Sequence, residues 1–203
     1  MSKETADIRK EEIISACEKL YEDISFNDIS IKLISEKTSF SRPSIYNYFN
    51  TKEEIFLSIV TREYDKWIED LNKIYNKKSM SKEDFAKELA HSLERRIKLL
   101  NLISVNMYDM EENSSIEYVT DFKKSYGKSI ETVKRCLIKF FPKMTENEIE
   151  EFIYTFFPFM IGIYPYAVVT EKKKEAMKNA NVQYKYYSLF EIANMGIKRI
   201  LGV

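Results

Sequence analysis

Apolar residues recur at intervals of three and four along most of the chain, and this spacing predicts amphipathic helices. One such stripe, in residues 51–76, contains Ile59, Trp67 and Ile74. No alternation of apolar and polar residues runs for more than a few positions, so the sequence does not predict strands. The sequence therefore predicts an all-α fold, with long helices over residues 5–22, 51–76, 81–107, 119–140, 145–169 and 182–201.

Hydroxyl side chains stand directly before several predicted helices. Ser30 and Ser41 precede two short helical patterns, and Thr51 begins a Thr-Lys-Glu-Glu capping box. Such a side chain accepts a hydrogen bond from a backbone N–H of the first turn that has no partner within the helix. Similar signals at Ser81 and Thr145 bring the expected number of helices to about nine.

Composition and the N-terminal stretch indicate the number of domains and the expected cellular compartment. The chain has 203 residues, of which 44% are hydrophobic and 32% charged, as expected for one or two globular domains. Only four Gly and four Pro occur, which disfavours a β-sandwich or barrel. The 32 basic and 32 acidic residues cancel, so net charge identifies no partner. The charged N-terminal stretch lacks the apolar segment of a signal peptide, and we expect a cytoplasmic protein with Cys17 and Cys136 as reduced, buried thiols.

The same composition argues against an enzyme and against a bound cofactor or metal. With four Gly in all, no phosphate-binding glycine loop occurs in the chain. One histidine, His91, and two cysteines do not supply the four ligands of a Cys/His zinc site. Asp109, Glu111 and Glu112 lie close together in sequence, and we interpret them as a solvated acidic loop. No nucleophile stands at helical spacing from an evident base, so we expect no catalytic site.

Residues 152–170 contain no charge, and three interpretations of them remain open. Nineteen such residues are long enough to span a bilayer, which would make this a membrane-associated or non-DNA interaction protein. Pro158, Gly162, Pro165 and three internal tyrosines favour instead a buried helix of a non-membrane core. In the third interpretation the apolar surplus is buried against a second subunit, because a helix that is apolar all round must be covered on all sides.

Residues 30–49 have the layout of a helix-turn-helix: a short helix, a turn at Thr38-Ser39-Phe40 and a second short helix. The expected inward positions are Ile31, Ile34, Phe40, Ile45 and Phe49. Helical geometry then turns Pro43, Ser44, Tyr46 and Asn47 outward, with Arg42 at the exposed N-terminal end of the second helix. Cationic, amide and small apolar groups of this kind suit the major groove of DNA. Periodicity alone also allows a solvated helical hairpin without function.

The residues from Ile29 to Lys52, ISIKLISEKTSFSRPSIYNYFNTK, resemble the DNA-binding region of the TetR family of bacterial transcriptional regulators. The most distinctive part is the Ser-x-x-x-Ile-Tyr-x-Tyr-Phe-x-x-Lys pattern from Ser41 to Lys52. The resemblance covers residues 8–60 closely, and beyond them it extends to length and helix count. Thr38-Ser39 replaces the usual Ala-Gly of the turn, and Ser25-Phe26 replaces a frequent Gly-Phe. Either difference would affect the backbone if the position needed a left-handed conformation.

The resemblance implies a DNA-binding domain over residues 1–50 and particular contacts with double-stranded DNA. It implies that Tyr46 lies near bases or backbone and that Lys32 reaches either. Its base readers would be Arg42, Pro43, Ser44 and Asn47, and its remaining contacts, mostly with phosphates, would be Ser30, Ser41, Tyr48, Thr51 and Lys52. Charge agrees in part, because residues 30–52 hold four basic residues and one acidic residue. Residues 1–60 hold eight basic and eleven acidic residues, so we expect modest non-specific binding.

For residues 51–203 the resemblance implies a ligand-binding and dimerisation domain. The protein would be a homodimer, paired through helices near 145–169 and 182–201, that represses from a palindromic operator. Gly196 would then allow close helix approach across the dimer interface, or is merely tolerated near the helix end. A small hydrophobic or aromatic effector would release DNA by shifting the population between two dimer geometries through the helix at 51–76. The candidate lining residues, each also readable as ordinary core, are Trp67, Met107, Tyr108, Tyr118, Phe122, Phe156, Met160 and Tyr164.

Overall fold

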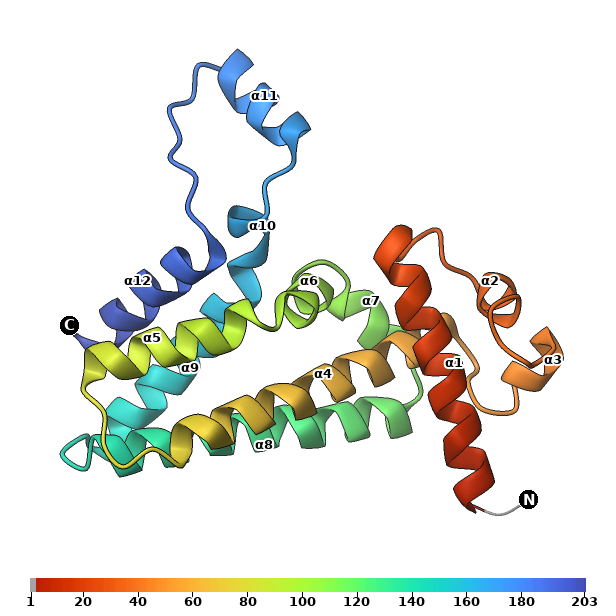
Figure 1. The fold of residues 1–203 in the computed structure, drawn as a ribbon, viewed down its shortest axis with the longest axis horizontal. Coiled ribbons are helices and arrows are strands. Elements are labelled where there is room, and N and C mark those ends of the chain that lie inside the picture. Colours follow the sequence, from red (N-terminus) through yellow and green to blue (C-terminus); the bar gives the residue numbers. More distant parts are fainter. Residues whose placement is uncertain (1–2) are drawn as a thin grey trace. The chain divides into compact units, whose positions relative to one another are not determined.

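The structure is a computed structural model that describes residues 3–203, with side chains from Thr5 onward. It is 74% helical, and the described residues contain no strand, which confirms the all-α prediction (Figure 1). The described part of the chain forms twelve helices, where the sequence predicted about nine. They are α1 (Lys3–Asp23), α2 (Ile31–Ser35), α3 (Arg42–Ile45), α4 (Lys52–Tyr75), α5 (Lys82–Glu94), α6 (Ile97–Val105), α7 (Met107–Glu112), α8 (Ile116–Phe140), α9 (Glu146–Gly162), α10 (Tyr164–Ala167), α11 (Glu171–Asn179) and α12 (Leu189–Leu201).

The additional helices arise because predicted long helices are interrupted. The predicted helix 81–107 divides into α5, α6 and the start of α7. At the first break the Arg96 N–H bonds the Leu93 carbonyl three residues back, at 2.8 Å, which is a tighter turn than an α-helix makes. The predicted helix 145–169 ends at Gly162 and is followed by the short α10, where Pro165 has no N–H to continue the ladder.

The last predicted helix begins later than the sequence suggested. It was expected over residues 182–201, but α12 begins at Leu189, after a capping box made by Ser188 and Glu191. Residues 181–188 are not helical, and the preceding α11 was not predicted at all. The side chain of Thr170 accepts a hydrogen bond from the Lys173 N–H and so begins α11. The break and the new helix together form a segment, residues 164–188, that separates α9 from α12.

The described chain divides into two compact units, with boundaries inside α4, between α6 and α7, and inside α8. The first unit contains residues 3–62 and 106–126, and the second contains residues 63–105 and 127–203. In the first unit α1, α2, α3 and the start of α4 enclose an apolar core, in which the rings of Phe26 and Phe56 lie 4.6 Å apart. Ile13, Ile34 and Ile45 are fully buried in this core.

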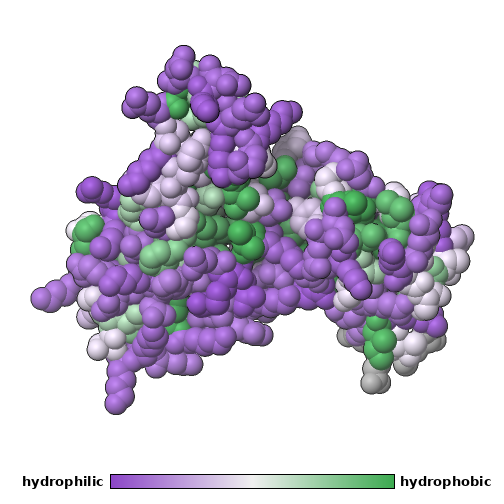
Figure 2. Space-filling model, turned by 45° about the horizontal axis from the view of Figure 1, so that its top comes forward, coloured by the Kyte–Doolittle hydropathy of each residue, from purple (hydrophilic) through white to green (hydrophobic). Residues whose placement is uncertain are grey.

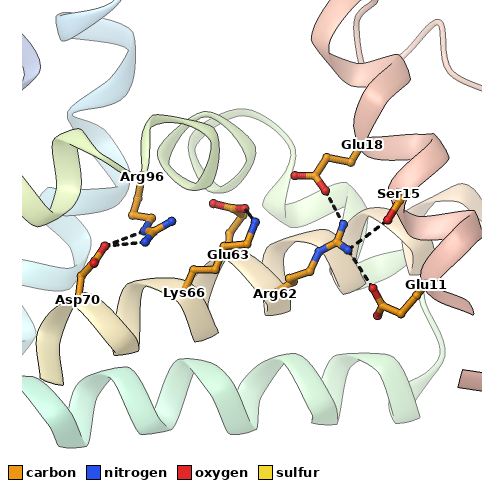
Figure 3. Close-up of polar contacts among 8 residues, drawn as sticks. All are labelled: Glu11, Ser15, Glu18, Arg62, Glu63, Lys66, Asp70 and Arg96. Carbon is orange, nitrogen blue, oxygen red and sulfur yellow. Dashed lines mark hydrogen bonds and ion pairs between the residues drawn. The ribbon is translucent and has the colours of Figure 1, made fainter. Parts of the chain in front are cut away.

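Arg62, near the end of the first unit, joins α4 to α1. Figure 3 shows its guanidinium among three side chains of α1, with Glu11 3.0 Å away, Ser15 3.5 Å away and Glu18 in close contact. The Arg62 side chain is half-buried, so the two carboxylates neutralise a charge that is partly removed from water. These contacts fix the register of α1 against α4.

The core of the second unit is centred on Trp67. Its indole ring is fully buried, and its Nε1 donates a hydrogen bond of 2.9 Å to Ser92 Oγ. The rings of Phe156 and Phe157 lie 6.4 Å and 6.0 Å from it. Burial of aromatic rings contributes a large share of the stability of a helical core.

Gly196 has a role within a single chain. In the second unit α12 lies along α5 and also contacts α9 (Figure 1). A side chain at Gly196 would collide with the ring of Phe159 on α9. The glycine therefore lets α12 approach α9 of the same chain, and an approach across a subunit interface stays a prediction.

Both cysteines are buried and unpaired, and they lie in different units. Burial raises the pKa of the Cys17 thiol to about 12 and that of Cys136 to about 11. Both thiols are therefore protonated at neutral pH and weakly nucleophilic. Among residues 3–203, no helix is at once long enough and apolar enough to cross a membrane.

Among the ion-paired carboxylates of the second unit, that of Asp70 is the most buried. It accepts hydrogen bonds of 2.6 Å and 3.0 Å from Arg96 (Figure 3). It also accepts one of 2.9 Å from Lys73. Burial alone would raise the pKa of the Asp70 carboxyl, but the hydrogen bonds from Lys73 and Arg96 and the nearby positive charges outweigh it, so the pKa is lowered. The turn between α5 and α6 is thereby anchored to α4.

We expect Asp70→Asn to lower the free energy of unfolding by about 2 kcal/mol at pH 7, because it removes the charge that Arg96 and Lys73 pair with. A lowered carboxyl pKa contributes stability above the unfolded pKa and loses it as pH falls through the folded pKa. In urea unfolding, the difference between wild type and variant should therefore narrow below about pH 4. Glu69→Gln, which removes an exposed neighbouring charge, is the control. If the difference in unfolding free energy between wild type and Asp70→Asn stayed constant from neutral to acidic pH, the Asp70 carboxylate would not stabilise the fold through its charge.

Candidate nucleic-acid interface

Two short helices, α2 and α3, form the helix-turn-helix of the first unit. Ser30 Oγ accepts a hydrogen bond of 3.3 Å from the Leu33 N–H and so begins α2. At the start of α3 the Oγ atoms of Ser41 and Ser44 lie 2.9 Å apart, and Pro43 occupies a first-turn position where no N–H is needed. The helix-turn-helix is thus formed at the residues where the sequence placed it.

The inward positions of this motif are those expected, with one exception. Ile31, Ile34, Ile45 and Phe49 are buried, while Phe40 is half-buried. The side chains left exposed include seven of the predicted DNA contacts: Ser30, Lys32, Ser41, Arg42, Pro43, Tyr46 and Asn47. The other four, which are half-buried, are Ser44, Tyr48, Thr51 and Lys52.

Arg42 and Tyr46 interact on the outward face of α3. Nη2 of Arg42 lies 3.3 Å from the Tyr46 hydroxyl, and the guanidinium carbon is 5.9 Å from the ring centroid. The tyrosine thus holds a cation at the surface. The Asn47 amide, in the turn just after α3, is exposed as well.

The turn does not need the glycine found in the TetR pattern. Among residues 3–203, positive φ values occur at Asn181 and Gly202 and not at Thr38 or Ser39. Thr38 Oγ1 donates to the Ser35 carbonyl at 3.2 Å and accepts from the Phe40 N–H at 3.3 Å. The Ser39 N–H donates to Glu12 on α1 at 2.7 Å, and this bond lowers the pKa of the Glu12 carboxyl. Thr38-Ser39 therefore forms the turn without backbone strain.

Lys52 and Thr51 bond atoms of the first unit itself. Lys52 Nζ donates to the carbonyls of Phe26 and Asn27, at 2.8 Å and 3.4 Å, and lies 4.5 Å from the Phe26 ring. Thr51 Oγ1 donates to the Asn113 carbonyl at 2.9 Å. Their contacts with phosphates stay a prediction, since the structure gives both side chains partners within the protein.

Arg9 is a basic residue beside the motif that the sequence analysis missed. Its Nη1 lies 3.4 Å from the Tyr48 hydroxyl, and its guanidinium is 5.6 Å from the Phe40 ring centroid. The only sequence signal was a basic residue near the start of the first amphipathic helix. Arg9 thus places a second guanidinium next to Tyr48, one of the predicted phosphate contacts.

The first turn of α8 contacts the end of the helix-turn-helix. Tyr118 donates a hydrogen bond of 2.6 Å to the carbonyl of Tyr48, and its ring lies 5.4 Å from that of Phe49. The buried carboxylate of Glu54 accepts from the Asn50 N–H at 2.6 Å and from the Ser115 N–H at 3.1 Å. Burial, followed by the negative charges nearby, raises the pKa of Tyr118, so its hydroxyl remains a donor. We name Tyr118 and Glu54 the α8 clamp.

The structure separates the predicted ligand-lining residues into two groups. In the second unit Trp67, Phe156 and Met160 are buried and Tyr164 is half-buried. The first unit holds the other four, of which Tyr118 belongs to the α8 clamp and Tyr108 is 77% exposed; they are Met107, Tyr108, Tyr118 and Phe122. The sequence could not separate them, because both groups have the same aromatic and methionine character.

An apolar hollow of about 370 Å³ lies elsewhere in the second unit. Its lining comes from α10, α11, the link between them and the segment that follows, and it contains none of the eight predicted residues; it includes Pro165, Tyr166, Val169, Lys173, Met177 and Tyr186. Among the described residues no cluster of three or more His, Cys, Asp or Glu is arranged to hold a metal ion.

Two family models together cover most of the chain. Residues 13–59 match the model for bacterial regulatory proteins of the tetR family, and residues 61–188 match the tetracyclin repressor-like C-terminal domain. The boundary between the two models lies within α4. The first match includes the whole helix-turn-helix.

Individual proteins also resemble the chain, at sequence identities between 14% and 32%. The uncharacterized HTH-type transcriptional regulator YfiR of Bacillus subtilis (strain 168) is 32% identical over 73 residues, a match that spans 36% of this chain and 36% of that protein. The fatty acid degradation regulator FadR from Bacillus halodurans has a TM-score of 0.61 at 15% identity, covering 95% of this chain and 97% of that one. FadR from Bacillus subtilis, solved in complex with stearoyl-CoA, has a TM-score of 0.58 at 14% identity, covering 93% and 96%. At these identities the structural matches establish the fold alone.

We expect Tyr118→Phe to lower the free energy of unfolding by about 1 kcal/mol, because it removes the hydrogen bond to the Tyr48 carbonyl and keeps the ring contact with Phe49. Tyr108→Phe, the same change at an exposed tyrosine of the same unit, should alter it by less than about 0.5 kcal/mol. Urea unfolding measures both, and amide exchange at residues 45–50 locates the effect. Equal stability of the two variants would show that the clamp hydrogen bond contributes nothing.

Proposed function

Since the chain belongs to the tetR family of bacterial regulatory proteins, we propose that it is a ligand-responsive repressor that binds a palindromic operator as a homodimer. Residues 1–50 form the DNA-binding domain, and residues 51–203 form the ligand-binding and dimerisation domain. A hydrophobic effector releases the protein from DNA. The family and the structural relatives are transcriptional regulators, which supports this function over an enzymatic one.

The observation that carries the proposal is the exposed face of α3. Arg42 and Pro43 are exposed on α3, and Asn47 is exposed in the turn just after it, all within the segment that matches the family model for bacterial regulatory proteins. A guanidinium donates two hydrogen bonds to guanine, an amide pairs with adenine, and a pyrrolidine ring contacts a thymine methyl. Together these three side chains read base edges in the major groove.

The surrounding residues position the protein on the DNA backbone. Ser30 and Ser41 stand at the helix starts, whose N–H groups face an anion, while Lys32 and Tyr46 reach bases or phosphates. The remaining predicted contacts on this side are Ser44, Tyr48, Thr51 and Lys52. Because residues 1–60 hold more acidic than basic residues, the affinity for random DNA is modest and depends weakly on salt.

The proposed effector is a long-chain acyl-CoA. FadR from Bacillus subtilis, which has this fold, is described in complex with stearoyl-CoA. The second unit of this chain offers an apolar interior around Trp67, Phe156 and Met160, with Tyr164 beside it, which suits an acyl chain. Binding shifts the population of dimers away from the DNA-binding geometry, through the helix α4 that begins beside the helix-turn-helix.

The DNA proposal is tested by selecting bound fragments from a random double-stranded pool with the purified protein. We expect an enriched palindrome. On that DNA, Arg42→Ala should raise the Kd at least about tenfold, because a bidentate base contact is worth about 1–3 kcal/mol. Asn47→Ala should relax the preference at one base step. Lys78→Ala, which removes an exposed cation between α4 and α5, is the control. If Arg42→Ala selects and binds the same DNA as Lys78→Ala, α3 does not read bases.

The effector proposal is tested by adding stearoyl-CoA to the protein bound to its selected DNA. Saturating ligand should raise the Kd for DNA about tenfold or more, and CoA without an acyl chain should not. Trp67 is the only tryptophan of the chain and is fully buried, so its emission reports occupancy of the interior directly. Unchanged emission together with unchanged DNA affinity would exclude long-chain acyl-CoA as the effector.

A further inference from the structure

Arg9 lies on α1, outside the helix-turn-helix and outside the residues that the TetR resemblance assigns to DNA contacts. Its side chain is exposed. Its Nη1 donates a hydrogen bond of 3.4 Å to the Tyr48 hydroxyl, and its guanidinium carbon lies 5.6 Å from the centroid of the Phe40 ring. Phe40 stands shortly before α3 and Tyr48 shortly after it. A cation of α1 therefore contacts both flanks of the helix that we propose reads DNA.

The first unit contains three arginines, and their surroundings differ. Arg62 is half-buried and pairs with Glu11 and Glu18, so carboxylates of the protein neutralise its charge. Arg9 and Arg42 are exposed, and each donates to a tyrosine hydroxyl and lies near an aromatic ring. A hydroxyl and a ring supply no negative charge. These contacts of Arg9 and Arg42 therefore hold a guanidinium in place and leave its positive charge to act on an anion.

The turn that contains Phe40 is tied to α1 close to Arg9. One turn of α1 further on, the carboxylate of Glu12 accepts a hydrogen bond of 2.7 Å from the Ser39 N–H. This bond lowers the pKa of the Glu12 carboxyl, so Glu12 is ionised and accepts the bond at neutral pH. The hydrogen bond fixes α1 against the turn, and with it the position of Arg9 beside Tyr48.

Exposure alone does not distinguish Arg9 from the other cations of the first unit. Hydrophilic residues are scattered over the face of this unit that Figure 2 shows, and residues 1–60 hold eight basic and eleven acidic residues. The distinguishing feature of Arg9 is that its guanidinium is held at a side chain that we expect to bind phosphate. Ordering of this kind reduces the entropy that a long side chain loses when it binds a ligand.

We propose that Arg9 contacts a DNA phosphate together with Tyr48, so that α1 extends the DNA-binding surface beyond the helix-turn-helix. This inference rests on the DNA binding of the proposed function. A phosphate oxygen bonded to the Tyr48 hydroxyl lies within about 6 Å of Arg9 Nη1, a gap that a small rotation of the flexible arginine side chain closes. The planar guanidinium bonds two oxygens of one phosphate, and such charge-assisted bonds are strong.

A phosphate suits Arg9 better than a base edge does. Base edges lie at the bottom of the major groove and are reached by the recognition helix, whereas groups on neighbouring elements contact the DNA backbone. Arg9 belongs to α1 and meets the helix-turn-helix at Tyr48, after the end of α3. A contact of Arg9 therefore adds affinity for any DNA sequence and does not change which sequence is preferred.

The salt dependence of DNA binding tests this contact. Arg9→Gln removes the charge and keeps a polar side chain, and the dissociation constant is measured over a range of salt on the DNA that the wild type selects. We expect the dissociation constant to rise about fivefold at low salt. The slope of its logarithm against the logarithm of salt concentration should fall by about 0.9, the value of one lost phosphate contact. Arg9→Lys, which keeps the charge, should keep nearly the wild-type slope.

Lys19→Gln is the matched control, because it removes the same charge from an exposed position of the same helix, roughly 15 Å further along. It should leave both the slope and the affinity unchanged. Tyr48→Phe completes a double-mutant cycle. If Arg9 and Tyr48 hold one phosphate, the double variant should raise the dissociation constant by less than the product of the two single effects. Urea unfolding verifies that each variant remains folded at the temperature of the binding measurement.

The outcomes separate this inference from the proposed function. An Arg9→Gln protein with the slope and affinity of Lys19→Gln overturns the phosphate contact and leaves the repressor proposal standing. A raised dissociation constant with an unchanged slope means that Arg9 only supports α3, and a changed selected sequence means that it reads a base, so either result also overturns the contact. A wild type that selects no DNA overturns the proposed function and this inference with it.

Discussion

A helix of four residues does not hold its shape in water, and the surface that we propose reads DNA is carried by such a helix. The shape of α3 therefore depends on what is packed behind it. Burial of Ile45 and Phe49 fixes its inner side, the Ser39 N–H ties the preceding turn to Glu12 of α1, and Tyr118 holds the Tyr48 carbonyl just after its end. Because every one of these contacts comes from another element, the outward side chains are positioned by the whole first unit.

Local signals explain which parts of this arrangement the sequence predicts. Hydroxyl caps and the periodicity of apolar residues act within a few positions, so the helix-turn-helix and the buried Ile34 and Ile45 could be identified from the chain alone. In the α8 clamp, Ser115 bonds Glu54 across 61 positions of sequence, and Tyr118 bonds Tyr48 across 70. No local pattern marks pairs that lie so far apart in the chain. For the same reason the hydrogen bond of Tyr118 to the Tyr48 carbonyl and the break at Arg96, which faces Asp70 of α4, were not predicted.

The charges of this chain cancel in number but not in place. Arg62 is half-buried and pairs with carboxylates of α1, while the buried Asp70 pairs with Arg96 of the turn between α5 and α6, so both fix α4 against other elements. At the surface the pattern is different, because glutamates gather at the start of α9 and lysines on α11. Paired charges thus order the interior of each unit, while separated charges remain available for partners. The net charge of zero reveals neither the buried pairs nor the separated surface charges.

The two thiols have a practical consequence for chemistry on this protein. Cys17 and Cys136 are shielded from solvent and remain protonated, and alkylating reagents attack the thiolate. The folded wild-type chain therefore behaves towards maleimides nearly as a cysteine-free protein does. A single cysteine introduced on an exposed surface would carry a fluorophore or spin label selectively, without first removing the native sulfur atoms from the core.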